Sequence, residues 1–507
     1  MPTDNYNLYT HFQCQFLAHA DKELLCTGDG QSHSYSDIEK KSAQVANFLS
    51  GLGTSPGDRV TVQVEKSPWS LCVYLACLRA GFVFHPLNMA YTESELQYFL
   101  DNAEPSLIIC DPKNEETIKN IAGLSLAQKV FTLDGTGGGN LSEYVNTAAD
   151  TFTDVKRGKN DLAALLYSSG TTGIPKGIML THKNLLRNTE ALVEAWGFSS
   201  NDRLLHALPI FHVHGLFVAI GCVLLSGASM RWLNSYNAEE VLRFLPESTV
   251  MMGVPTYYTR LLATNKIGTE ITRNVRVFIS GSAPLLEETF LEFEKKTGHR
   301  ILERYGMTET NMNTSNPLDG MRKPGTVGPP LPGIAVRITD DEGTVVPGGT
   351  IGNLQVKGPN VFIGYWKMPD KTTDDFTADG FFNTGDKGRI DDDGYVSIVG
   401  RAKDIVITGG LNVYPKEVEL FIDDLPDVIE SAVIGLPEND LGEGVVAIAV
   451  PKNMDKISEE SIIITCKQHL ANFKIPKRVI FVDELPRNTM GKVQKNKLRN
   501  TYQNLLK

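Results

Sequence analysis

The sequence predicts an α/β protein with more than one domain. Its 507 residues exceed what one hydrophobic core usually organises. Up to about residue 320, short apolar runs of strand length alternate with amphipathic helical patterns, which is typical of a sheet covered by helices on both faces. After residue 320, short alternating strands are joined by Gly and Asp turns, which favours an antiparallel, barrel-like part.

Individual elements support this class. An amphipathic helix is predicted over 35–49, where Ile38, Val45 and Leu49 share one face. A second helix follows Thr181, which is a suitable N-cap residue. Pro415 favours the first turn of a helix in a further α/β unit. The predicted strands cover 57–64, 82–86, 107–110, 129–133, 162–166, 178–180, 250–255, 275–280, 335–338, 353–357 and 395–399.

Composition and charge exclude several classes of function. The net charge of −11 and the pI near 5.5 argue against a nucleic-acid-binding surface. The first residues lack a basic region followed by an apolar one, so we expect no signal peptide, and no apolar run reaches the length of a membrane span. The lack of such a run predicts no membrane partner. The seven cysteines show no paired spacing, which predicts a reducing, cytoplasmic location.

The most informative stretch is Tyr167-Ser-Ser-Gly-Thr-Thr-Gly-Ile-Pro-Lys-Gly177, between two apolar runs. Glycines allow close approach of backbone N–H groups, hydroxyls donate hydrogen bonds, and Lys176 adds a positive charge, so the stretch suits a polyphosphate. A solvated turn needs neither the hydroxyls nor the lysine. The stretch is not a Walker A loop, because Pro175 prevents a helix from starting at the lysine.

The loop resembles the phosphate-binding loop of the adenylate-forming superfamily, which contains acyl-CoA synthetases, peptide-synthetase adenylation domains and luciferases. Further motifs follow in the order of that superfamily across residues 162–492. They are Pro209-Ile-Phe-His212, Gly281-Ser-Ala-Pro284, Tyr305-Gly-Met-Thr-Glu309, Asn383-Thr-Gly-Asp386, Gly400-Arg-Ala-Lys-Asp-Ile405 and Asn488-Thr-Met-Gly-Lys492.

The resemblance implies roles for individual residues. The expected catalytic residues are Lys492, which would bridge carboxylate and α-phosphate, with Thr308 and Glu309. Glu309 would hold Mg²⁺, with Thr171 as a further candidate ligand. The expected ATP- and AMP-binding residues are Ser168, Ser169, Gly170, Thr171, Thr172, Gly173, Lys176, Gly281, Ser282, Ala283, Tyr305, Thr308, Asp386 and Arg401.

The resemblance also implies a domain organisation. Residues 1–399 would form an N-terminal AMP-binding domain with a barrel-like subdomain at about 320–399, and 405–507 a small mobile lid. Residues 400–404 would form the hinge, with Lys403 at its pivot. Rotation of the lid would replace Lys492 with Gly409 and Gly410 beside a tunnel for CoA.

Three stretches, 207–218, 251–256 and 304–316, resemble malonyl-CoA synthetases more than other members of the superfamily. Arg304 directly precedes the Tyr-Gly-Met-Thr-Glu motif, at the wall of the expected acyl pocket, which His212 and Met307 also line. An arginine there would reject a hydrocarbon tail and pair with a second carboxylate. The alternative is that Arg304 points outward to an acid such as Glu303. A metal site at His212 and His214 is disfavoured, because no Cys, Asp or Glu lies nearby.

The predicted function is therefore AMP-forming ligation of malonate to CoA. ATP and CoA are the expected co-substrates, and Mg²⁺ is the expected cofactor. Methylmalonate is a further expected substrate. The alternatives are a short-chain or aryl acyl-CoA synthetase, transfer of the acyl group to a carrier protein, and a non-catalytic nucleotide-binding relative. The chain ends shortly after Lys492, so we expect no fused carrier domain. Lys492 is also a candidate target of acetylating and deacetylating enzymes, because acetylation would remove its charge.

Overall fold

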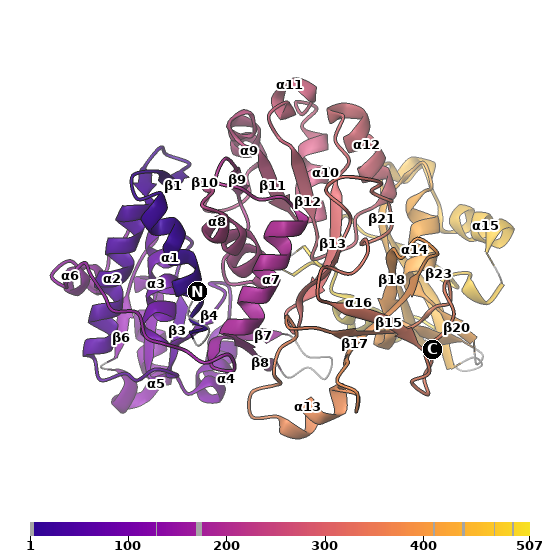
Figure 1. The fold of residues 1–507 in the computed structure, drawn as a ribbon. Helices are drawn as coiled ribbons and strands as arrows, with labels where there is room; N and C mark the ends of the chain where they lie inside the picture. The colour runs from indigo at the N-terminus through magenta and orange to yellow at the C-terminus, as the bar shows by residue number, and fades with distance from the viewer. Residues whose placement is uncertain are drawn as a thin grey trace.

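The computed structural model describes residues 5–127, 129–168, 175–408, 411–438, 442–470, 472–488 and 491–506. Two large sheets, one of six strands and one of eight, dominate its first part (Figure 1). Both are parallel at their centres and carry antiparallel strands at an edge. This arrangement confirms the α/β class predicted from the alternating strand and helix patterns.

In both sheets, the spatial order of the strands differs from their order in the chain. From one edge to the other, the six-stranded sheet contains β6 (Val130–Thr132), β5 (Leu107–Cys110), β3 (Arg59–Gln63), β4 (Val83–Pro86), β7 (Leu162–Ser168) and β8 (Lys176–Thr181). The eight-stranded sheet contains β14 (Asn311–Ser315), β13 (Leu302–Met307), β12 (Val277–Ser280), β11 (Val250–Gly253), β9 (Arg203–His206), β10 (Ser229–Trp232), β1 (Glu23–Thr27) and β2 (Ser32–Ser34).

Helices pack between and around these sheets, and α1, α7 and α8 contact one another between them (Figure 1). The α-helices before residue 300 are α1 (Leu8–Ala18), α2 (Tyr35–Gly51), α3 (Pro68–Ala80), α4 (Glu93–Ala103), α5 (Glu115–Ala127), α6 (Asn140–Val145), α7 (His182–Ala195), α8 (Ile220–Ser226), α9 (Ala238–Phe244), α10 (Pro255–Ala263), α11 (Thr269–Thr272) and α12 (Glu287–Thr297). Short 3₁₀ turns are η1 (Pro112–Asn114) and η3 (Leu245–Glu247).

Local chemistry explains where several of these elements begin. Thr181 caps α7, as predicted, by accepting a hydrogen bond from the backbone N–H of Asn184. Ser34 and Asp37 form a capping box at the start of α2. Ile38, Val45 and Leu49 are buried along α2, which confirms its predicted apolar face. Pro175 precedes a strand, β8, rather than a helix, which agrees with the exclusion of a Walker A loop.

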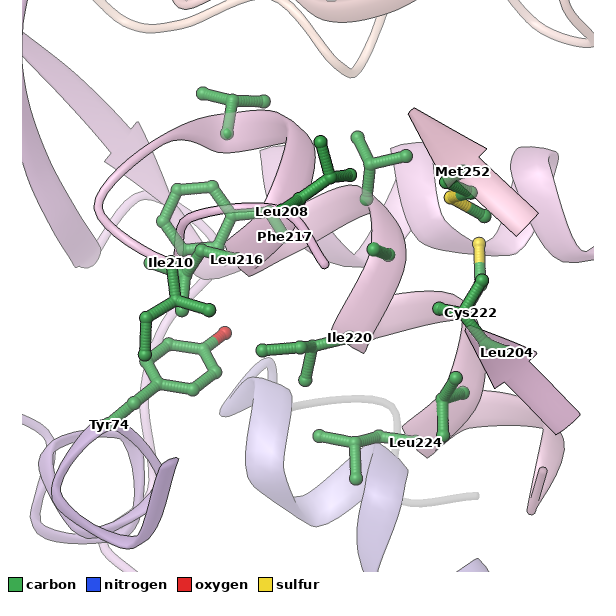
Figure 2. Close-up of a cluster of buried hydrophobic side chains, with 14 of the residues drawn as sticks. Tyr74, Leu204, Leu208, Ile210, Leu216, Phe217, Ile220, Cys222, Leu224 and Met252 are labelled. Atoms are coloured by element: carbon green, nitrogen blue, oxygen red, sulfur yellow. The ribbon is translucent and has the colours of Figure 1, made fainter. Parts of the chain in front are cut away.

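A π-helix, η2 (His214–Ala219), leads directly into α8 and was not predicted from the sequence. Its apolar side chains and those of α8 fill the space between α3 and strands β9 and β11. Figure 2 shows Phe217 facing Tyr74, and Cys222 between Leu204 and Met252. This packing fixes the orientation of the π-helix, whose first residue, His214, faces the candidate site.

The barrel-like part is a four-stranded antiparallel sheet that begins at residue 335. Its strands pair in sequence order as β15 (Ala335–Thr339), β16 (Gly352–Lys357), β17 (Phe382–Ile390) and β18 (Val396–Arg401), and α13 (Pro369–Asp375) lies between β16 and β17 in the chain. Strand β17 was not predicted as a strand, because its sequence Phe-Asn-Thr-Gly-Asp-Lys-Gly-Arg-Ile has little apolar alternation.

The last part of the chain has its own sheet and its own buried clusters. Its strands are β20 (Leu411–Val413), β19 (Val406–Thr408), β22 (Gly442–Pro451), β21 (Val428–Glu438) and β23 (Arg478–Phe481). Its helices are η4 (Ala402–Asp404), α14 (Pro415–Asp423), η5 (Met454–Lys456), α15 (Glu459–His469), η6 (Asn472–Lys474) and α16 (Lys495–Tyr502). Among the described residues, no helix has the length and hydrophobicity needed to cross a membrane.

Candidate active site

The candidate site lies where strands of the eight-stranded sheet end. Strands β9, β11, β12 and β13 run parallel, so their carboxyl ends meet at one edge. Open α/β sheets bind ligands at this edge. Gly281 directly follows β12, and Arg304, Tyr305 and Met307 form the end of β13. The turn 281–283 and the Tyr-Gly-Met-Thr-Glu motif are therefore neighbours, although the sequence separates them by more than twenty residues.

Asp386 is held from two sides. The Tyr305 hydroxyl donates a short hydrogen bond to one oxygen, and Arg401 Nε pairs with the other at 2.8 Å. Burial and the adjacent Asp386 charge raise the pKa of Tyr305 well above its ordinary value. Burial is the largest single influence and would lower the pKa of Arg401, but the nearby charges, of which Asp386 is the strongest, together raise it. The expected ribose-binding carboxylate and its arginine are therefore fixed before any nucleotide binds.

The phosphate loop connects two paired strands. Ser168, at the end of β7, lies opposite Lys176, at the start of β8. Lys176 is buried and lies 4.9 Å from the centre of the Tyr365 ring, and burial is the main cause of its lowered pKa. Five expected ligands, Ser169, Gly170, Thr171, Thr172 and Gly173, lie outside the described residues.

Glu309 is buried, and desolvation raises its pKa. The nearby charges of Arg401 and Lys176 oppose this rise. One carboxylate beside a phosphate-binding lysine fits Mg²⁺, which proteins often hold through one or two carboxylates and substrate phosphates. Thr308 lies in the turn that follows β13, next to Glu309, and is half-buried.

Lys492 approaches this site from the last part of the chain. Its pKa is lowered, first by the protein that surrounds it and then by the charge of Arg401, although solvent still reaches the side chain. The charges of Asp386 and Glu309 act in the opposite direction. The Lys492 charge in turn contributes to the lowered pKa of His212. The structure thus brings Lys492, Asp386, Glu309 and His212 into electrostatic contact.

The turn after β12 lies against Arg304. A Cβ atom at Gly281 would lie 2.5 Å from Arg304 Cζ, so only glycine leaves room for the guanidinium. Ser282 has a φ of 71°, a strained conformation for a residue other than glycine, and its Oγ lies 3.2 Å from His214 Nδ1. Ala283 is half-buried. The turn expected to bind adenine therefore also forms one wall around Arg304.

Arg304 is only 3% exposed, and its Nε and Nη2 atoms are buried without a hydrogen-bond partner in the described part of the chain. Burial lowers its pKa to about 9, so it remains charged at neutral pH. Burying an unpaired cation of this kind costs free energy, which an anionic ligand would offset.

The outward orientation of Arg304 is contradicted by this burial. Its sequence neighbour Glu303 points to the opposite side of β13, where its Oε1 accepts a hydrogen bond from the Leu285 backbone at 3.2 Å. Burial raises the pKa of Glu303 to about 7. Adjacent residues of a strand face opposite sides, so the side chains of Arg304 and Glu303 cannot form an ion pair.

His212 and His214 lie on the same side of the site as Arg304. Burial lowers the pKa of His212 to about 4, and burial together with the Arg304 charge lowers that of His214 well below its usual value. Both imidazoles are therefore neutral at pH 7. No group of three metal-ligating side chains occurs among the described residues. Sequence reasoning considered His214 only as a metal ligand and missed its contact with Ser282.

The remaining expected residues are more peripheral. Met307 is half-buried and packs against the main core at the end of β13. Lys403 lies in η4, between β18 and β19, and is exposed. Gly409 and Gly410, the residues expected beside a CoA tunnel, lie outside the described residues.

Two family models match the chain. The AMP-binding enzyme model matches residues 12–366, and the AMP-binding enzyme C-terminal domain model matches residues 417–492. The chain belongs to the AMP-binding enzyme family. Together the matched regions contain most residues of the site, from the phosphate loop to Lys492.

Relatives within this family include the malonate–CoA ligase of Arabidopsis thaliana. It is 35% identical over 525 residues, which cover 94% of this chain and 86% of the relative. The crystal structure of ATP-bound MatB from Rhodopseudomonas palustris is 51% identical, with a TM-score of 0.97, and covers 99% of this chain and 100% of that one. The apo structure of MatB has the same identity and coverage but a TM-score of 0.84. The present structure is therefore more similar to the ATP-bound form.

Proposed function

We propose that the protein is an ATP-dependent, AMP-forming malonate–CoA ligase. The observation that carries the proposal is Arg304, a buried cation with two unsatisfied guanidinium nitrogens at the edge of the site. A second carboxylate on the substrate would supply both the missing charge and the missing hydrogen-bond acceptors. The similarity to malonate–CoA ligase and to MatB supports the same substrate.

In the first half of the reaction, one malonate carboxylate attacks the α-phosphorus of ATP, and pyrophosphate leaves. Because an anion approaches a polyanion, the site must supply positive charge and oriented donors. Lys492 bridges the attacking carboxylate and the α-phosphate, Lys176 binds the distal phosphates, and Thr308 donates to phosphate. Asp386 accepts hydrogen bonds from the ribose. Mg²⁺ held by Glu309 would neutralise phosphate charge when bound.

Arg304 orients malonate during this step. It binds the carboxylate that does not react, which leaves the other one free to face Lys492. His212 and Met307 line the pocket, and both His212 and His214 are neutral, so they add no competing charge. Methylmalonate fits the same scheme, because an added methyl group alters selectivity by only about 1–3 kcal/mol. Acetate leaves Arg304 unpaired and is disfavoured more strongly.

In the second half, the CoA thiolate attacks the acyl carbon of malonyl-adenylate, and AMP leaves. We propose the division into residues 1–399, a hinge at 400–404 and a lid at 405–507, with rotation at Lys403 between the two halves. The separate buried clusters before and after this hinge support independent movement of the lid. Gly409 and Gly410 would then lie beside the pantetheine chain.

The decisive experiment is pyrophosphate release with a panel of acids, with and without CoA. We expect malonate to exceed acetate, propionate and coumarate by a large factor, with AMP and malonyl-CoA as products when CoA is present. A preference for a monocarboxylate would refute the proposed role of Arg304, but the assignment to acid–CoA ligases would still hold. CoA-independent loading of a carrier protein would instead favour the carrier-transfer alternative.

Lys492 offers a second proposal, reversible acetylation as a means of control. Its side chain is reached by solvent, and acetylation would remove the charge that adenylation requires. Chemically acetylated protein should lose about 10²–10³-fold in adenylation, the usual effect of losing one electrostatic donor. Treatment with a lysine deacetylase should restore it. Full adenylation by protein shown to be acetylated at Lys492 would refute the proposal.

A cytoplasmic location is also proposed. All seven cysteines are unpaired, and all but Cys14 are buried. Free thiols of this kind are typical of a reducing compartment. Cell fractionation with a cytoplasmic marker would test the assignment.

A further inference from the structure

The described residues 487–488 and 491–493 pair with each other, and we call this pair of segments the Lys492 hairpin. Arg487 and Val493 face each other in an isolated β-bridge. The backbone N–H of Asn488 donates to Lys492 O at 2.9 Å, and the Lys492 N–H donates back to Asn488 Oδ1 at 2.9 Å. The backbone that carries the proposed adenylation lysine is therefore locally ordered.

Arg487 connects this hairpin to the sheet beneath it. Its Nη1 donates to Gly491 O at 2.5 Å, and its Nη2 forms a short ion pair with Glu430. Glu430 lies on β21, which is paired with β22 along most of its length. Both side chains are about three-quarters buried. A rigid strand thus holds the peptide unit that directly precedes Lys492.

Gly491 also lies close to the large domain. Gly491 has a φ of 74°, and a Cβ atom there would lie 3.1 Å from Thr256 Oγ1 in the first turn of α10. Arg487 therefore holds the backbone from the lid, while Thr256 limits it from the large domain. The Arg487 hydrogen bond thus restrains the backbone next to Lys492, and Thr256 leaves little space beside Gly491.

We propose that Arg487, held by Glu430, is the positioning residue for Lys492 in adenylation. The inference rests on the proposed function. A lysine side chain is long and flexible, so its charge reaches one point reliably only when its backbone is fixed. Displacements of about 1 Å in such groups can cost on the order of 100-fold in rate. Thioester formation uses a different lid surface, so Arg487 has no part in it.

The test separates the two halves of the reaction. Arg487→Met should lower the rate of malonate-dependent pyrophosphate release about 10- to 100-fold, with KM for ATP and malonate changed by less than about 3-fold. Thioester formation from synthetic malonyl-adenylate and CoA should stay within about 3-fold of the wild-type rate. Arg487→Lys keeps the charge but not the two-sided contact, so it should restore only part of the loss. Glu430→Gln should show a smaller loss in the same direction.

Arg478→Met is the matched control. Arg478 also forms an ion pair in the lid, with Glu459 at 2.7 Å, but is not part of the hairpin. The Arg478→Met variant should carry out both half-reactions at the wild-type rate. A double variant provides a further check, because Arg487→Met should cause no additional loss of adenylation in a Lys492→Ala background.

Three outcomes would overturn the inference. The first is equal loss of both half-reactions in Arg487→Met, which would indicate a structural role. The second is an additional loss in the Lys492→Ala background, and the third is wild-type adenylation in a folded Arg487→Met protein. If the wild-type protein released no pyrophosphate with malonate or any other acid, the proposed function itself would fail, and this inference with it.

Discussion

Two arginines of the same site, Arg304 and Arg401, are in opposite electrostatic situations. Arg401 is paired with Asp386 at 2.8 Å, and Tyr305 donates to the same carboxylate. Arg304 has no anionic partner among the described residues and keeps two unsatisfied nitrogens. This contrast indicates that the two arginines have different roles. The paired arginine pre-organises the part of the site that meets the nucleotide, whereas the unpaired one is completed only by the substrate that carries a second negative charge.

The largest effect is expected at Arg304 itself. Arg304→Met should lower kcat/KM for malonate by about 10²–10⁴-fold, because removing one partner of a buried charge pair costs roughly 3–5 kcal/mol. Binding of ATP should change little, because Arg401 and Lys176 remain. Steady-state kinetics with malonate and equilibrium ATP binding would check this. Retention of malonate turnover would show that Arg304 is not the clamp for the second carboxylate.

Gly281→Ala tests whether the position of Arg304 matters as well as its charge. The new Cβ would lie 2.5 Å from Arg304 Cζ and would displace the guanidinium. We expect about a 10²-fold loss in malonate kcat/KM, comparable to the cost of misplacing a binding group by about 1 Å. Gly51→Ala, where the added methyl would contact nothing, is the control. Equal activity of the two variants would refute the packing argument.

The two arginines should also differ in their effect on stability. Without substrate, Arg304→Met removes an uncompensated buried charge and should stabilise the folded protein by about 1–2 kcal/mol. Arg401→Met should destabilise it by about 1–3 kcal/mol, because Asp386 stays buried without its partner. Denaturant unfolding of ligand-free protein measures both. If both variants changed stability in the same direction, the difference between the two arginines would not be electrostatic.

A further stability effect, which does not alter activity at the site, concerns Glu303 on the opposite face of β13. Its pKa is raised to about 7 from an ordinary value of 4.5, so the folded protein holds a proton that the unfolded chain releases. Its contribution to stability is therefore present below pH 4.5 and is lost as the pH rises to 7. We expect stability to fall between about pH 5 and 8 by about 1–3 kcal/mol more in the wild type than in Glu303→Gln.

Unfolding measured at several pH values would test this prediction. Asp423 also has a pKa raised to about 7, but it is present in both proteins and cancels in the comparison. Parallel stability curves for wild type and Glu303→Gln would show that Glu303 does not titrate differently in the folded state.

The sequence by itself determined the local features of this protein. Pro175 excluded a helix starting at Lys176, Thr181 predicted the start of α7, and the spacing of Ile38, Val45 and Leu49 predicted the buried face of α2. These features depend on interactions between residues close in the chain, so their patterns are readable there. The order of motifs likewise identified the family that the family models match.

The tertiary structure alone decided how distant side chains meet. That Arg304 is buried without a partner depends on Gly281 and His214, neither of which lies next to it in the sequence. The π-helix that contains His214 was not predicted from the sequence, and neither was the contact between Arg487 and Glu430. Burial and pairing are set by chain segments tens to hundreds of residues apart, and only folding brings those segments within reach of one another.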